Sequence, residues 1–181
     1  YNGTTFYFVI DPSDATYSGD MMLFGLHGSI PDDPNEDYNF FGFGIEADDD
    51  EMRVHVYDGT GALHSHDTGI DNTTGAQLWT LAFREEGSDA STGVLYKDGD
   101  MSGKYVIDMS AGGSHSYNRS QEIKLFNGAF CIGHDVNASG NPSGKNHWKG
   151  KIYEFLIYNK ENRHADNVLI EAYLKTKYGI S

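Results

Sequence analysis

The chain has 181 residues, and its 12 Tyr, 10 Phe and 2 Trp supply enough apolar bulk for one domain built on one core. Its formal net charge of −14, from 27 acidic and 13 basic side chains, argues against phosphate backbones and anionic membranes as partners. No stretch approaches the ~20 apolar residues of a membrane span. We therefore expect one domain over residues 1–181 that binds no nucleic acid and does not insert into a membrane.

Short strand-like runs dominate the chain, each bounded by Gly, Asp, Asn or Ser. Strands at this spacing, with turn residues between them, are typical of an antiparallel sandwich or barrel. The sequence therefore predicts an all-β fold. The expected strands, in chain order, are 6–10, 21–26, 39–46, 52–57, 78–84, 94–97, 104–108, 123–126, 130–133 and 151–158.

One segment near the C-terminus differs from the rest, because residues 163–178 are good helix formers. Asn162 is the expected N-cap and Gly179 the expected stop. We expect a short C-terminal α-helix that closes an open end of the sandwich. The residues that recur near the 3.6-residue period are Ala165, Val168, Leu169, Ala172, Tyr173 and Thr176.

The central hairpins predict a strand register. If residues 47–50 form an acidic loop, the register pairs Ile45, Phe43 and Phe41 with Met52, Val54 and Val56. If residues 58–61 make a two-residue turn, it pairs Val56, His55 and Arg53 with Leu63, His64 and His66. Both registers gather apolar residues on one face, as a buried face requires.

The opposite face of these hairpins is a candidate ligand-binding surface. Gly42 and Gly44 would floor a groove that seats a flat sugar ring, although a solvated sheet face has the same composition. The candidate ligand-binding residues on this face are Arg53, His55, Tyr57, His64 and His66.

The long polar loop 133–147 is a second candidate for ligand recognition. It is rich in Gly and lies between two expected strands, where such folds place binding groups, although a plain connector is the equal alternative. Trp79 and Trp148 are expected in the core, and Cys131 is expected to be a packed thiol in a strand. The loop residues that can hydrogen-bond to sugar hydroxyls are Asp135, Asn137, Asn141 and His147.

Six motifs point to one superfamily: Trp79-Thr80-Leu81-Ala82-Phe83, Leu95-Tyr96-Lys97-Asp98-Gly99, Phe130-Cys131-Ile132-Gly133, Trp148-Lys149-Gly150, Glu154-Phe155-Leu156-Ile157-Tyr158 and Tyr173-Leu174-Lys175-Thr176-Lys177-Tyr178-Gly179. These motifs resemble the laminin-G-like members of the concanavalin A-like lectin and glucanase superfamily. The resemblance covers nearly the whole chain and implies two curved antiparallel sheets in jelly-roll order. It also implies glycan or protein binding, often with Ca²⁺ at a rim, and some relatives are glycoside hydrolases or polysaccharide lyases.

Two acidic segments, 31–37 and 46–51, are candidates for binding Ca²⁺, because clustered carboxylates and carbonyls suit a hard cation. Neither segment has the spacing of an EF-hand, and a solvated acidic loop is the alternative. The candidate metal ligands are Asp32, Asp33, Asp37, Asp48 and Asp50.

The segment 46–51 is also similar to the E-x-D-x-x-E motif of laminarinase-like hydrolases on this fold. That resemblance would make Glu46 the nucleophile, Asp48 the residue that tunes its protonation, and Glu51 the acid/base. The motif functions on a strand whose intervening residues are buried, but Asp49 and Asp50 cannot occupy core positions unpaired. The segment therefore fits an acidic hairpin loop better than a catalytic strand.

The leading hypothesis is a non-catalytic module that binds carbohydrate or glycoprotein, with Ca²⁺ as the candidate cofactor. The chain starts at Tyr1 without a signal-peptide pattern, which suggests a processed protein or a domain of a longer one. The resemblance implies that the setting is a larger extracellular or surface protein. The alternative is a structural or assembly domain of a viral or cell surface that contacts neighbouring domains or subunits. The second alternative is a glycoside hydrolase that uses Glu46, Asp48 and Glu51.

Overall fold

The computed structural model describes residues 3–12, 21–29, 40–48, 51–57, 63–71, 74–86, 90–108, 128–133, 148–160 and 162–181. Strands account for most of these residues, and one α-helix follows the last strand. The elements are β1 (Gly3–Asp11), β2 (Met21–Ser29), β3 (Phe40–Asp48), β4 (Glu51–Tyr57), β5 (Leu63–Asp71), β6 (Gln77–Glu86), β7 (Ala90–Lys97), the 3₁₀ turn η1 (Met101–Gly103), β8 (Tyr105–Asp108), β9 (Gly128–Ile132), β10 (Lys151–Tyr158) and α1 (His164–Tyr178).

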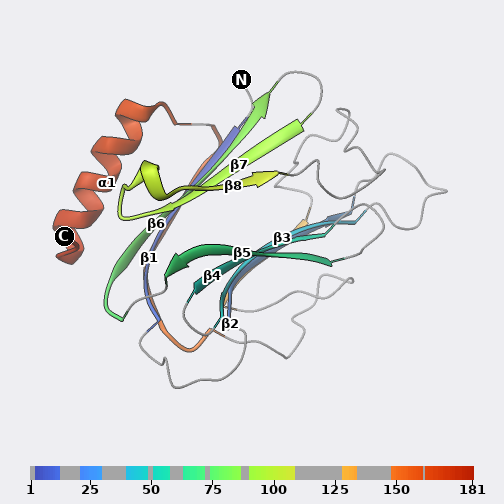
Figure 1. Cartoon of the computed structure of the whole chain (residues 1–181), viewed down its shortest axis with the longest axis horizontal. Helices are drawn as coiled ribbons and strands as arrows, with labels where there is room; N and C mark the ends of the chain where they lie inside the picture. Colours follow the sequence, from blue (N-terminus) through green and yellow to red (C-terminus); the bar gives the residue numbers. More distant parts are fainter. Residues whose placement is uncertain are drawn as a thin grey trace.

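The strands form two five-stranded sheets that lie one over the other (Figure 1). The first sheet has the order β10-β1-β6-β7-β8 and the second the order β5-β4-β3-β2-β9, with every neighbouring pair antiparallel. Helix α1 lies outside the first sheet, on the side away from the second (Figure 1). The predicted all-β sandwich with a C-terminal helix is confirmed, but the helix packs on the outer face of the first sheet and does not close an open end of the sandwich as expected. The expected strand 123–126 lies outside the described residues.

The core between the sheets is aromatic. The ring centroids of Phe6 and Phe24 lie 5.6 Å apart, and Phe155 lies 5.4 Å from Phe24, so that rings from both sheets touch. Trp79 is fully buried, as predicted, and Trp148 is half-buried against the same cluster. Each ring removes a large apolar area from water, which makes this cluster the main source of hydrophobic stabilisation in the described part of the chain.

Helix α1 buries a different side from the one that the sequence period indicated. Its buried residues are Asn167, Glu171 and Leu174, whereas Leu169 is 70% exposed and Tyr173 58%. The first sheet presents tyrosine and threonine hydroxyls beneath the helix, so this interface takes polar partners and apolar periodicity alone does not identify it. All six residues of the predicted period are exposed: Ala165, Val168, Leu169, Ala172, Tyr173 and Thr176.

The ends of α1 confirm one prediction and correct another. Gly179 adopts a left-handed conformation with φ 67° and donates its backbone N–H to Lys175 O, as expected of a helix stop. Asn162 is not the N-cap, because the N-cap is Arg163, which makes no capping hydrogen bond through its side chain. Asn162 is instead buried against β1, where its backbone N–H donates to Thr5 Oγ1 at 3.0 Å. Within the described ranges, no helix has the length and apolarity needed to cross a bilayer.

Candidate functional site

The second sheet has two faces, and β4 shows which residues lie on each. Met52 is fully buried in the core, whereas the next residue, Arg53, has a side chain that is 24% exposed. Because alternate positions of a strand lie on opposite faces, residues 53, 55 and 57 belong to the outer set. Register extends this outer face to neighbouring strands, and its members include Gly25, His27, Gly42, Gly44, Glu46, Arg53, His55, Tyr57 and Asp67.

The observed β3–β4 register differs from the predicted one by two residues. Ile45 pairs with Val54 and Phe43 pairs with Val56, because β3 continues to Asp48 and only two residues separate the strands. The predicted loop 47–50 was too long. A shift of two leaves each residue on its predicted face, so the division between apolar and polar positions is unaffected.

The observed β4–β5 register differs from the predicted one by a single residue, which does change the site. Tyr57 pairs with Leu63, so five residues connect these strands instead of a two-residue turn. His64 pairs with Val56 and His66 with Val54, which places both histidine positions in the inner set. The prediction that His64 and His66 share a face with Arg53 is therefore wrong.

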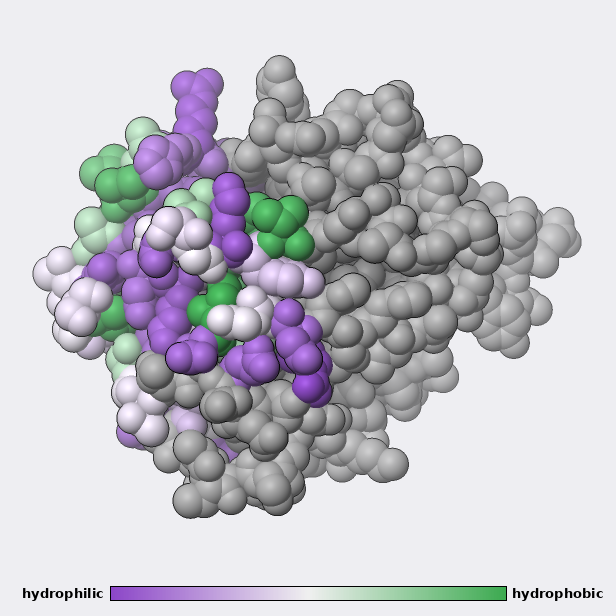
Figure 2. Space-filling view, in the orientation of Figure 1, coloured by the Kyte–Doolittle hydropathy of each residue, from purple (hydrophilic) through white to green (hydrophobic). Residues whose placement is uncertain are grey.

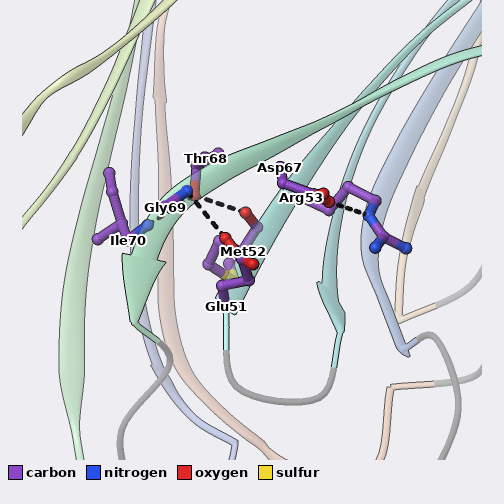
Figure 3. A network of polar contacts seen from close by, with 7 residues as sticks. All are labelled: Glu51, Met52, Arg53, Asp67, Thr68, Gly69 and Ile70. Atoms are coloured by element: carbon purple, nitrogen blue, oxygen red, sulfur yellow. Dashed lines mark hydrogen bonds and ion pairs between the residues drawn. The ribbon is translucent and has the colours of Figure 1, made fainter.

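A bulge follows in β5, where three residues lie opposite Met52 alone (Figure 3). Thr68 Oγ1 donates to Met52 O at 2.5 Å, and Gly69 N donates to Glu51 Oε2 at 2.9 Å. Gly69 has φ +65°, a conformation that glycine adopts without strain. The bulge keeps Ile70 packed against the core while Asp67 stays on the outer face, 60% exposed.

Glycines occupy three neighbouring positions of the outer face. Gly44 pairs with Gly25 on one side and with His55 on the other, while Gly42 pairs with His27 and Tyr57. These three positions of β2 and β3 carry no side chain of their own, and the register partners of Gly44 and Gly42 on β4 are His55 and Tyr57. The sequence analysis did not include Gly25 and His27 among the candidate residues. Their alternation with the apolar Phe24 and Leu26 along β2 indicates that they lie on the outer face.

The second sheet is strongly acidic. Arg53 is the one Lys or Arg in its five strands, and Arg53 Nε lies 2.7 Å from Asp67 Oδ1 (Figure 3). Glu46 is the register partner of Arg53 on the other side, so this cation lies between two acidic positions. The acidic residues of the sheet are Glu46, Asp48, Glu51, Asp67 and Asp71.

The hydrolase motif is divided between two strands. Glu46 and Asp48 belong to β3, whereas Glu51 begins β4 and pairs with Asp48 across the turn. Glu51 also accepts a hydrogen bond from Gly69 N in the bulge. The three carboxylates thus do not follow one another along a single strand, which is the arrangement on which the catalytic resemblance depended.

Most of the remaining predicted site residues lie outside the described residues. For Asp48 the structure gives a place in β3 and the register, but not the side chain. In the part of the chain that is described, no group of three or more His, Cys, Asp or Glu could hold a metal ion. The residues outside the description are Asp32, Asp33, Asp37, Asp50, Asp135, Asn137, Asn141 and His147.

A separate polar cluster lies buried between α1 and the first sheet. Glu171 Oε1 accepts hydrogen bonds from Thr80 Oγ1 at 2.9 Å and from Tyr96 OH at 2.8 Å. Tyr7 OH donates to Asn167 Oδ1 and accepts from Asn162 Nδ2. Burial raises the pKa of Tyr7 to about 12 and also raises the pKa of Tyr96. This cluster fixes the helix on the sheet and is a packing contact, not a surface site.

Comparisons with known proteins show the fold. No protein-family model and no curated protein matches the chain. Solved structures do: a receptor-binding domain of botulinum neurotoxin mosaic serotype C/D shares 15% identity, with a TM-score of 0.57 over 95% of this chain. A botulinum neurotoxin serotype D binding domain shares 14%, with a TM-score of 0.51 over 94%.

A further match is the serotype D ligand-binding domain in complex with N-acetylneuraminic acid, at 10% identity and a TM-score of 0.52 over 94% of this chain. This chain covers 36% of each of these three structures, so it spans about a third of their length. At such low identity the likeness shows a shared β-sandwich architecture and no more.

Proposed function

We propose that this chain is a non-catalytic carbohydrate-recognition module of a larger extracellular protein. The observation that supports this most is that nearly the whole chain matches part of a receptor-binding domain and part of a ligand-binding domain that is in complex with N-acetylneuraminic acid. The division of Glu46, Asp48 and Glu51 between two strands supports a binding role over glycoside hydrolysis. A fold alone does not determine a function, so the proposal also depends on the residues of the site.

The proposed contact surface is the glycine-floored part of the outer face. A sugar ring would lie over Gly25, Gly42 and Gly44, where the lack of a side chain would allow a close approach to the backbone. His55 and Tyr57 border this floor and would supply an imidazole and an aromatic ring for contact with the pyranose. In this proposal Arg53 lies at the rim, paired with Asp67.

Binding to a glycan array, followed by calorimetry on the best ligand, tests the proposal. We expect Gly44→Thr to abolish binding, because a branched side chain would fill the floor while still suiting a strand. Gly103→Thr is the matched control, since Gly103 lies in η1 and an added Cβ would only touch Asp100 Oδ2 at 3.4 Å. Tyr57→Ala should weaken binding at least tenfold. Absence of any glycan signal, or equal binding by Gly44→Thr, would refute the proposed site.

Calcium assistance and the loop 133–147 are further proposals. Carboxylates at Asp32, Asp33, Asp37, Asp48 and Asp50 would bind Ca²⁺ at a rim. Repeating the array with a chelator tests the cation, and Asn137→Ala tests the loop. Binding that is unchanged in both experiments would restrict recognition to the outer face.

A structural or assembly domain is the second candidate function. Exposed apolar residues on α1 favour it, with Val168 at 48%, Leu169 at 70% and Tyr173 at 58%. On the face shown in Figure 2, however, hydrophobic surface lies in separate spots with hydrophilic surface between them, so the described part of this face shows no continuous apolar patch, which counts against assembly. Oligomers that form with increasing concentration and dissociate in Leu169→Glu, without glycan binding, would favour assembly over recognition.

A further inference from the structure

The charge of the second sheet indicates which glycans its outer face can accept. The five strands carry one Lys or Arg, Arg53, against five Asp and Glu. The first sheet is more balanced, with three basic residues in its strands against five acidic ones. The local excess adds to a formal net charge of −14 for the whole chain, so we expect a negative potential at this face.

The single cation does not offset this potential. Arg53 Nε is 2.7 Å from Asp67 Oδ1, within the distance of a charge-assisted hydrogen bond, and Glu46 occupies the register position on its other side. An anionic ligand would have to displace Asp67 from Arg53 or approach the other acidic positions of this sheet. A neutral hydroxylated ligand meets neither obstacle, because hydroxyls both donate and accept hydrogen bonds.

We infer that the outer face selects uncharged glycans and discriminates against sialylated or otherwise acidic ones. This inference rests on the proposed function and adds to it the class of ligand. It differs from the chemistry of the matched structure in complex with N-acetylneuraminic acid, and the fold likeness carries no ligand with it. Selection of this kind comes from repulsion of the wrong ligand as much as from attraction of the right one.

One glycan in two forms tests the inference: an N-acetylneuraminic acid-terminated oligosaccharide and the same oligosaccharide after sialidase treatment. At pH about 7.5, above the ordinary pKa of histidine, and about 20 mM salt, we expect the desialylated form to bind about threefold to tenfold more tightly. Salt at about 300 mM should reduce this ratio, because the Debye length shortens and the repulsion is screened.

A pair of charge variants assigns the effect to this face. Asp67→Asn should reduce the ratio of the two affinities at low salt, whereas Asp166→Asn, the same change of charge on α1, should leave that ratio nearly unchanged. Equal or tighter binding of the sialylated form at low salt would overturn the inference and leave the proposed function standing. Binding of neither form would overturn the proposed function, and the inference with it.

Discussion

The outer faces of the two sheets differ in whether a helix covers them. The outer face of the first sheet is covered by α1, and its polar groups are buried and paired: Thr80 and Tyr96 with Glu171, and Tyr7 with Asn167. The outer face of the second sheet has no helix over it among the described residues and carries glycines at three neighbouring positions. The outer face of the first sheet positions α1 through these hydrogen bonds, whereas the outer face of the second sheet positions no described helix.

This difference places stability and recognition on opposite sides of one core. A buried polar network holds its partners in one geometry, because every unmade hydrogen bond there costs the full desolvation penalty. Glycine positions contribute little to packing and weaken a strand. Residues such as Gly42 and Gly44 therefore suit a surface that contacts a ligand better than one that stabilises the fold.

The largest expected effect separates the two sides of α1. Leu174→Ala should lower the free energy of unfolding by about 2–5 kcal/mol, since Leu174 is fully buried and its loss leaves a cavity. Leu169→Ala, on the exposed side, should change it by no more than about 0.5 kcal/mol. Urea denaturation followed by circular dichroism measures both. Equal losses would mean that the helix does not lie on the sheet as described.

The next effect tests the polar network itself. Glu171→Ala should destabilise the fold by about 1–3 kcal/mol, because the hydroxyls of Thr80 and Tyr96 lose their buried acceptor. Glu171→Gln keeps an acceptor oxygen in place and should lower the free energy of unfolding clearly less than Glu171→Ala does. If the two variants lose the same amount in denaturation, the hydrogen bonds to Glu171 do not hold the helix, and the contrast between the faces weakens.

Alkaline pH provides a third test of the covered face. The pKa of Tyr7 is raised to about 12 in the folded protein, against 10.0 for an ordinary tyrosine, because burial disfavours the phenolate. Its contribution to stability is therefore complete below pH about 10 and is lost as the pH rises through about 12. Thermal unfolding across this range should show a steeper loss in the native protein than in Tyr7→Phe; parallel curves would contradict the assignment.

The sequence predicted the sandwich and its apolar sets well, because both depend on alternation along single strands. Alternation does not determine how neighbouring strands pair, and two hairpin registers were predicted wrongly. The β3–β4 register differs by two residues and leaves each residue on its face, whereas the β4–β5 register differs by one and exchanges the faces. Loop length decided both registers, and the turn residues 58–61 did not reveal that five residues connect Tyr57 and Leu63.

The prediction of which side of α1 is buried was wrong for a different physical reason. Its apolar period was real, but the sheet beneath it offers hydroxyls, and so Asn167 and Glu171 are buried while Leu169 is exposed. Which side of a helix packs inward depends on the partner surface, and a single sequence does not contain that pairing. The bulge opposite Met52 was missed likewise, although Gly69 was its one local signal.

The smallest expected effect belongs to the outer face of the second sheet. In a double-mutant cycle with Arg53→Gln and Asp67→Asn, urea denaturation should give a coupling of about 0.2–1 kcal/mol in the free energy of unfolding. The coupling is small because Asp67 is 60% exposed and water screens the pair. The coupling should fall as salt is raised, whereas the loss in Glu171→Ala, from a buried site, should not. A large, salt-independent coupling would mean that this face is as tightly organised as the one beneath α1. A weak coupling fits a surface whose charges govern which ligand approaches while the fold depends on the other side of the molecule.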